Sequence, residues 1–212
     1  RQKYYPITMN TSQLKSFAQQ ARLKLMEQVG AKLHYVLNVD SASIRGKEQE
    51  LNKLKAELNE IGEQALIEKV AYTWFNRLVA IRFMDANGFQ PFNVSIISPV
   101  EGSQSSLAEV IELIQGGNIP EELNLDRGLI NDLLDGKAVS NNPNNEIMRM
   151  VLVEACNYYH SLFPFLFEKI NDYTELLLPD DLVSPISILA DVVKGMSKED
   201  CAEVEIIGWL YQ

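Results

Sequence analysis

Residues 71–84 carry the sequence AYTWFNRLVAIRFM, which is apolar on nearly every side of a helix. An amphipathic helix on the surface of a small domain would instead show a single apolar stripe. The stretch is therefore predicted to form a central, buried helix. It also carries Arg77 and Arg82, and a buried charge needs a partner. Asp85 lies three residues after Arg82 and can pair with it on one helix. Structural ion pairs are thus favoured over the alternative, contact with phosphate.

The helical pattern continues on both sides of this stretch. Toward the C-terminus it stops at Asn87-Gly88, a pair typical of helix ends. Toward the N-terminus, apolar residues recur at heptad-like spacing over residues 47–66, which favours a helix packed on its own domain over a dimeric coiled coil. Gly62 interrupts this pattern and predicts a bend or a short break between two helices.

The N-terminal region predicts another long helix. Residues 1–8 differ in character from the rest of the chain and are interpreted as a tag remnant or leader. Thr11 or Ser12 can cap a helix that runs to about Val29, with apolar residues at helical spacing. Gly30 is expected to end it.

Only two short pieces have strand character, namely the alternating residues 33–39 and the apolar residues 94–97. After them the sequence reads as short helices separated by glycine and proline. The predicted fold class is mainly α, a multi-helix domain over residues 9–212 with at most a short strand or hairpin. A division into two subdomains, residues 9–103 and 104–212, stays open.

The net charge of −10 is unevenly distributed. The first 103 residues hold 13 basic and 10 acidic side chains, whereas residues 104–212 hold 6 basic and 19 acidic ones. An acidic surface repels a phosphate backbone. Any contact with DNA is therefore expected within residues 9–88, and the alternatives are that the acidic half is simply a solvated surface and that the isolated domain binds no DNA. The cations whose reversal to glutamate would test such contact are Lys15, Arg22 and Lys24.

The sequence offers no catalytic, cofactor-binding or metal-binding residue. It has no Gly-x-Gly turn, no Walker-type loop and no Pro-Pro pair of the kind found in adenine methyltransferase loops. Cys156 and His160 share a helix face, but a core role is favoured over a zinc site or a catalytic dyad. Cys156 and Cys201 are expected to be reduced, which fits a cytoplasmic protein. No apolar run is long enough to span a membrane.

Paired carboxylates and an aromatic cluster are interpreted as structural. The pairs are Asp180-Asp181 and Glu199-Asp200, and the second lies at a predicted helix start, where negative charge is favourable. The aromatic residues are Tyr158, Tyr159, Phe163, Phe165 and Phe167. Because the surrounding charge is acidic, packing is favoured over stacking on bases.

Four segments resemble the N-terminal region of one known family. They are Ala71–Met84, Phe163–Glu168, Glu175–Asp180 and Glu205–Gln212. In this order they are similar to the PglX family, the adenine-specific DNA methyltransferases of BREX phage-defence systems, or to a closely related restriction–modification methyltransferase. The apolar end at Trp209, Leu210 and Tyr211 also predicts that the chain is cut from a longer protein.

The resemblance implies a parent enzyme whose methyltransferase domain lies beyond residue 212. That domain would bind S-adenosylmethionine and methylate the N6 atom of an adenine flipped out of DNA. No catalytic residue of the family can be carried over to this chain. The chain would be a non-catalytic domain that aids DNA engagement, packs on its own methyltransferase domain or binds other defence-system proteins. The alternative is a stand-alone helical adaptor for protein partners.

Overall fold

The described part of the chain is built from helices, with no strand among the described residues. This computed structural model describes residues 11–38, 44, 46–162, 167, 173–203 and 205–210, so the predictions for residues 1–8, Phe163, Phe165 and residues 211–212 lie outside it. The helices are α1 (Thr11–Asn38), α2 (Glu48–Ile61), α3 (Glu63–Asn87), α4 (Glu109–Gln115), α5 (Arg127–Leu134), α6 (Pro143–Leu162), the 3₁₀ turn η1 (Glu175–Leu177), α7 (Ile188–Gly195), α8 (Lys198–Cys201) and α9 (Glu205–Leu210). The prediction of a mainly α fold is confirmed.

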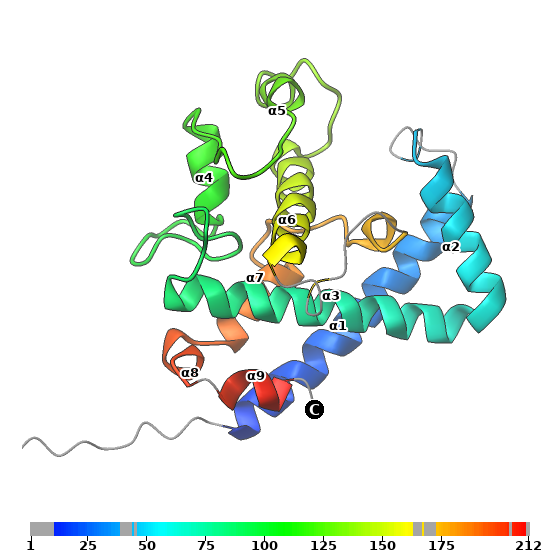
Figure 1. Ribbon diagram of the computed structural model, residues 1–212, viewed down its shortest axis with the longest axis horizontal. Helices are drawn as coiled ribbons and strands as arrows, with labels where there is room; N and C mark the ends of the chain where they lie inside the picture. The colour runs from blue at the N-terminus through cyan, green and yellow to red at the C-terminus, as the bar shows by residue number, and fades with distance from the viewer. Residues whose placement is uncertain are drawn as a thin grey trace, which may run out of the picture.

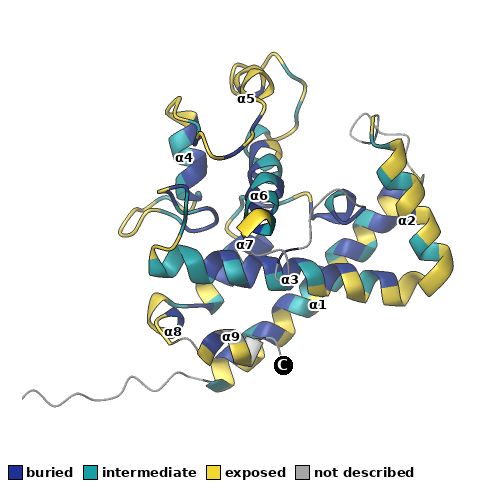
Figure 2. Ribbon diagram, viewed as in Figure 1, coloured by how far each residue is buried: buried dark blue, intermediate teal, exposed yellow. Residues whose placement is uncertain are grey.

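Helix α3 crosses the middle of the molecule, and the other helices lie on both sides of it (Figure 1). Its middle part, from Val70 to Arg82, is mostly buried, whereas its first turns are largely exposed (Figure 2). Trp74, Phe75 and Leu78 are fully enclosed, and Arg77 and Arg82 are buried with them. The predicted central helix is thus confirmed, including its two buried arginines.

Two glycines mark the ends of α3 as the sequence indicates. Gly62 has a φ of +83° and separates α2 from α3, which is the predicted break. Gly88 has a φ of +66°, and its N–H bonds back to the last turn. Because L side chains adopt this left-handed conformation only at a cost, glycine is the favoured residue at both positions.

The expected end of the first helix at Gly30 is wrong, and so is the strand character of residues 33–38, whereas residue 39 lies outside the described residues. Helix α1 continues through Gly30 to Asn38. Its buried stripe includes Val29, Leu33 and Val36, and this packing outweighs the roughly 1 kcal/mol that a helical glycine costs. A Cβ at Gly30 would lie 3.3 Å from the Ile67 side chain. The glycine therefore lets α1 and α3 approach closely.

The second expected strand, residues 94–97, is also absent. These residues form bends and irregular backbone. The backbone N–H groups of Ile96 and Ile97 donate to the Asp85 carboxylate, at 2.8 and 2.9 Å, and not to a neighbouring strand. The apolar side chains of Val94, Ile96 and Ile97 are buried, which explains why the segment has an apolar sequence.

Helix α7 packs against α1 through a contact that only glycine permits. A Cβ at Gly195 would lie 2.1 Å from a ring carbon of Phe17 on α1. Lys24 of α1 also pairs with Asp191 of α7. The buried apolar residues of both halves of the sequence form one continuous core. No helix in the described ranges has the length and apolar character that a membrane span requires.

Candidate functional site

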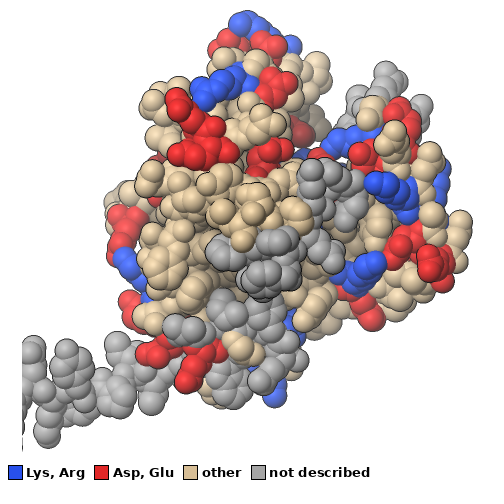
Figure 3. All heavy atoms as spheres, viewed as in Figure 1, with Lys and Arg blue, Asp and Glu red and all other residues tan. Residues whose placement is uncertain are grey.

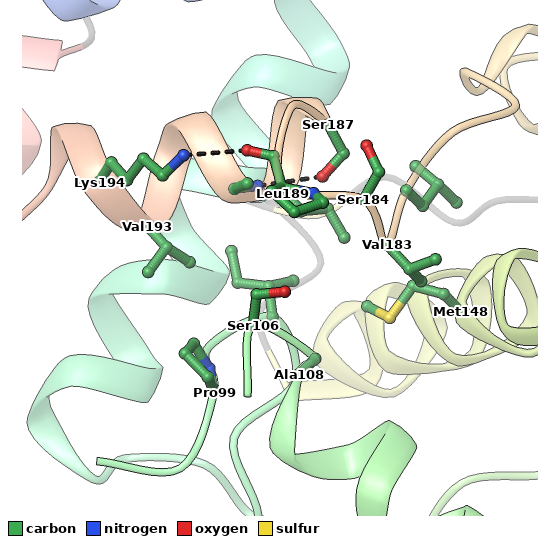
Figure 4. A pocket seen from close by; sticks show the side chains of 14 residues that line it. Pro99, Ser106, Ala108, Met148, Val183, Ser184, Ser187, Leu189, Val193 and Lys194 are labelled. Atoms are coloured by element: carbon green, nitrogen blue, oxygen red, sulfur yellow. Dashed lines mark hydrogen bonds between the residues drawn. The ribbon is translucent and has the colours of Figure 1, made fainter. Parts of the chain in front are cut away.

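An open cleft of about 210 Å³ lies between α7 and the segment that precedes α4. Figure 4 shows Val193 of α7 on one side, Pro99 and Ala108 on the other, and Met148 of α6 at one end. Further apolar lining comes from Ile97, Leu182, Val183, Pro185 and Leu189. The cleft is mostly apolar and open to solvent, which is the character of a binding site for apolar groups.

One wall of the cleft is fixed by Asp85, near the end of α3. Its carboxylate accepts backbone N–H groups from Ile96, Ile97 and Ser98 at 2.8–2.9 Å, and the Ser98 hydroxyl at 2.8 Å. Gln90 donates to the same carboxylate at 2.6 Å. A group that accepts this many bonds sets the path of the backbone. Asp85 therefore holds the turn that carries the lining residues near Ile97.

Arg82 joins the two walls of the cleft. Its Nε donates to the carbonyl oxygen of Met196, directly after α7, at 2.9 Å. Its Nη1 donates to the hydroxyl of Ser98 on the opposite wall at 2.9 Å. The predicted direct pair with Asp85 is therefore replaced by a bridge through Ser98. The sequence spacing allowed a same-helix pair, but the folded chain offers both side chains nearer partners on other segments.

The buried network extends from Asp85 toward α6. The Tyr159 hydroxyl donates to Gln90, which in turn donates to Asp85. Burial raises the pKa of Asp85, and the bonds from Ile96 and Ile97 oppose that effect. Burial also raises the pKa of the Tyr159 hydroxyl. These groups support structure, because each is bonded to protein partners within the core.

Ser184, Ser187 and Lys194 at the cleft are bonded to the protein itself. Ser187 caps α7 by accepting the N–H of Ala190 at 3.2 Å, and Lys194 donates to the carbonyl oxygen of Pro185 at 2.9 Å (Figure 4). The Ser184 hydroxyl donates to Asp181. The surface offered to a partner is therefore mainly the apolar one, and it suits apolar side chains better than a charged substrate.

The residues weighed as metal ligands or nucleophiles lie apart from the cleft. Cys156 is buried, and burial raises the pKa of its thiol to about 12. His160 contacts the carbonyl oxygen of Phe167. Cys201 is also free and buried, with a thiol pKa raised to about 11. The prediction that both cysteines are unbridged is confirmed. Within the described ranges no three potential metal ligands gather.

The other singled-out side chains have structural roles where they are described. Ser197 caps α8 by accepting the N–H of Asp200 at 3.0 Å, and its hydroxyl donates to the Asp200 carboxylate at 2.8 Å, so the Glu199-Asp200 pair does lie at a helix start. Tyr159 and Phe167 lie 5.0 Å apart between ring centroids, and both are buried. The described part of the aromatic cluster, Tyr159 and Phe167, therefore packs within the core and is not available to stack on bases. Asp180 is an exception, because its carboxylate is largely exposed and pairs with Lys32.

The three cations chosen for a DNA-binding test differ in their surroundings. Lys15 is exposed. The Arg22 guanidinium lies 4.6 Å from the centroid of the Phe75 ring. Lys24 pairs with Asp191. Reversing Arg22 or Lys24 would therefore disturb the packing of α1, and loss of DNA binding in such a variant could not be assigned to a lost phosphate contact.

The basic first half and the acidic second half are joined by ion pairs. Three such pairs are Lys24–Asp191, Lys32–Asp180 and Lys47–Glu175. On the face shown in Figure 3, basic and acidic side chains alternate over α2 and no uniformly basic stripe crosses the described surface. A stripe of that kind is the usual footprint of a protein that grips a DNA backbone. The charge asymmetry thus serves, at least in part, to hold the fold together.

The sequence matches proteins of known type along nearly its whole length. It is 32% identical over 227 residues to the adenine-specific methyltransferase BrxX of Escherichia coli O9:H4 (strain HS), an alignment that covers 96% of this chain. It is 29% identical over 244 residues to the adenine-specific methyltransferase PglX of Lacticaseibacillus casei (strain Zhang), again covering 96% of the chain. The chain is thus similar to a region of BrxX and of PglX. This confirms the resemblance to the BREX methyltransferases.

The chain spans about a fifth of the length of these relatives, 18% of BrxX and 20% of PglX. No protein-family profile matches it. The cleft could not be predicted from the sequence, because its lining comes from three segments that are distant along the chain. The Pro99 and Pro185 turns and the apolar face of α7 were the only local signals, and none of them indicates that the segments meet.

Proposed function

We propose that this chain is a non-catalytic domain of a DNA N6-adenine methyltransferase of a phage-defence or restriction–modification system. Its relatives are named adenine-specific methyltransferases, and it corresponds to only a fifth of their length. The parent enzyme would use S-adenosylmethionine in the cytoplasm, and its catalytic domain would hold the cofactor and flip the target adenine. The present domain would aid DNA engagement by assembling with that catalytic domain.

The apolar cleft beside α7 is the observation that carries this proposal. Of the ionisable groups near the core, Cys156 and Tyr159 are buried, and the half-buried Asp85 is bonded to protein donors. The cleft instead offers an apolar, open surface between firmly held walls. Its occupant in this proposal is a pair of apolar side chains from the catalytic domain. About four fifths of each relative lies outside the matched region, and in this proposal part of that length packs against this domain.

A stand-alone adaptor remains the second candidate, because one other surface fits it. Leu129, Leu134 and Val139 are exposed on and after α5, which protrudes from the molecule (Figure 1). An exposed apolar surface of this kind would suit a protein partner. The coding sequence after Gln212 separates the two candidates. Continuation into a methyltransferase domain supports the first, and a stop codon near Gln212 supports the adaptor.

Changing Val193 to aspartate is expected to weaken docking of the domain. Val193 is half-buried at the cleft, so an aspartate can reach solvent in the free domain but would be enclosed once the cleft is covered. Enclosing an unpaired charge costs several kcal/mol. In the full-length enzyme, methylation of DNA should fall at least tenfold while S-adenosylmethionine binding is unchanged. A methylation assay and calorimetric titration measure the two effects.

The matched control is Val139→Asp, which places the same charge on a fully exposed valine far from the cleft. This variant should retain wild-type methylation under the domain-docking proposal. Equal activity of the Val193 and Val139 variants would contradict docking through the cleft. Loss of activity in the Val139 variant alone would instead point to the surface at α5.

A further inference from the structure

A polar groove runs along α1 on the side that faces α6 and η1. It consists of two adjoining cavities of 460 and 390 Å³, which share Lys32, Tyr35 and Asp180 as lining residues. The larger cavity is also lined by Lys47, Arg149, Glu146, Glu175 and three asparagines, Asn141, Asn142 and Asn145. Its lining is far more polar than that of the cleft beside α7, so the two sites suit different partners.

Two cations in this groove share one carboxylate. Lys32 pairs with Asp180 Oδ1, and Arg149 Nη2 lies 3.6 Å from the same oxygen. The side chains of Lys32 and Arg149 are only 13% and 18% exposed, whereas that of Asp180 is 74% exposed. A single exposed carboxylate therefore covers two largely enclosed positive charges. Such a carboxylate can move into solvent and leave the cations to another anion.

The cations are held in place by other segments. Arg149 donates to the carbonyl oxygens of Leu178 and Pro179 at 3.3 and 3.0 Å, which fixes its guanidinium independently of Asp180. The groove also contains the start of α6, a helix of 20 residues, and its first turn adds positive potential. Glu175 is paired with Lys47, and Asp181 accepts from Ser184. Glu146 is exposed and opposes an anion.

We propose that this groove binds a nucleotide, with its phosphate between Lys32 and Arg149 in place of the Asp180 carboxylate and its base against Tyr35. Arginine and lysine together provide the donors that a phosphate requires. The Tyr35 ring is 44% exposed, and its centroid lies 5.1 Å from the Lys32 ammonium. A base stacked on this ring would therefore lie beside a phosphate on Lys32. The exposed amides of Asn141 and Asn142 can bond to base edges.

The acids of the groove indicate the size of this ligand. Glu146, Glu175 and Asp180 balance the three cations of the larger cavity, so a long polyanion gains little there. A single nucleotide, or the end of one strand, places one phosphate on the two cations nearest Asp180 and keeps its remainder on Tyr35 and the asparagines. A free nucleotide and the end of a nucleic-acid strand both present one phosphate and one base to the groove. Their affinities, measured side by side, distinguish the two ligands.

The test titrates the 212-residue chain at low salt with adenosine monophosphate, inorganic phosphate and a single-stranded deoxyadenylate decamer, followed by calorimetry. Changing Asp180 to asparagine should tighten binding of the monophosphate about tenfold, because the competing carboxylate is removed. Arg149→Gln should weaken it at least tenfold. Tyr35→Ala should weaken binding of the monophosphate but leave that of inorganic phosphate unchanged.

The control is Glu101→Gln, which removes an equally exposed acid that pairs with Lys198 outside the groove. It should leave every affinity unchanged. Tighter binding of the decamer would assign the site to a nucleic-acid strand, and tighter binding of the monophosphate would assign it to a free nucleotide. The proposal is overturned if neither the wild type nor the Asp180→Asn variant binds any of the three, or if Arg149→Gln binds as well as the wild type. Cleft variants such as Val193→Asp should bind nucleotide as the wild type does. The outcome of this test is therefore independent of whether the cleft docks the catalytic domain.

Discussion

Replacing Asp85 with alanine is expected to lower the free energy of unfolding by roughly 3–5 kcal/mol, because several hydrogen-bond donors lose one shared acceptor. Three backbone N–H groups, from Ile96, Ile97 and Ser98, would lose their acceptor. Each buried donor left without a partner costs roughly 1–3 kcal/mol. Urea unfolding followed by circular dichroism measures the change.

Asparagine at the same position separates charge from shape. Asp85→Asn keeps one acceptor oxygen but turns an N–H₂ group toward donors, so it should lose less stability than alanine while remaining clearly destabilised. Asp135→Ala is the matched control, because Asp135 is an exposed acid that pairs with Lys137. It should change stability by no more than about 0.5 kcal/mol. Similar losses in the Asp85 and Asp135 variants would refute the role assigned to Asp85.

The same change has a consequence for the cleft. Asp85 holds one wall, and through Ser98 it orients Arg82, which holds the other wall at Met196. Loss of the hydrogen bonds at Asp85 would therefore make both walls of the cleft more mobile. This links the central helix to the proposed docking role, because α3 positions a site that it does not itself line.

Local signals made much of the helical architecture predictable. Helix α3 is recognisable because residues 71–84 are apolar on nearly every side, and Gly62 and Gly88 mark its ends through backbone conformations that favour glycine. Gly30 misled the prediction, because the same residue type can serve a close approach between helices as well as a helix end. A glycine at a helix end and a glycine at a close helix contact differ in which segment packs against them. The local sequence does not contain that information.

The sites were less predictable than the helices for a related reason. Arg82 was expected to pair with Asp85, three residues away, but it bonds to Met196, which is more than a hundred residues away. Arg149 lies in the acidic half, where no anion site was expected, and its neighbour Lys32 comes from α1. Spacing along one helix can be read from sequence, whereas the meeting of distant segments depends on how all the helices pack.

Replacing Trp74 with alanine is expected to cost roughly 4–5 kcal/mol of unfolding free energy, near the upper end for a buried aromatic residue. Trp74 is fully enclosed, and its indole N–H donates to the carbonyl oxygen of Thr174 at 2.9 Å. The Arg77 guanidinium lies 5.1 Å from its ring centroid and donates to the Thr174 hydroxyl at 3.3 Å. The substitution would thus remove apolar packing, a hydrogen bond and the surface beneath a buried charge.

Phenylalanine at position 74 separates the contribution of ring packing from that of the indole hydrogen bond. Trp74→Phe retains most of the ring packing and loses the N–H donor, so a loss of roughly 1–3 kcal/mol is expected. Because Thr174 directly precedes η1, whose Glu175 pairs with Lys47, both variants should also weaken nucleotide binding in the groove, alanine more than phenylalanine. Denaturant unfolding and the calorimetric titration measure the two effects on the same samples. A Trp74→Ala variant that loses stability but binds nucleotide as the wild type does would show that α3 supports the core without positioning the groove.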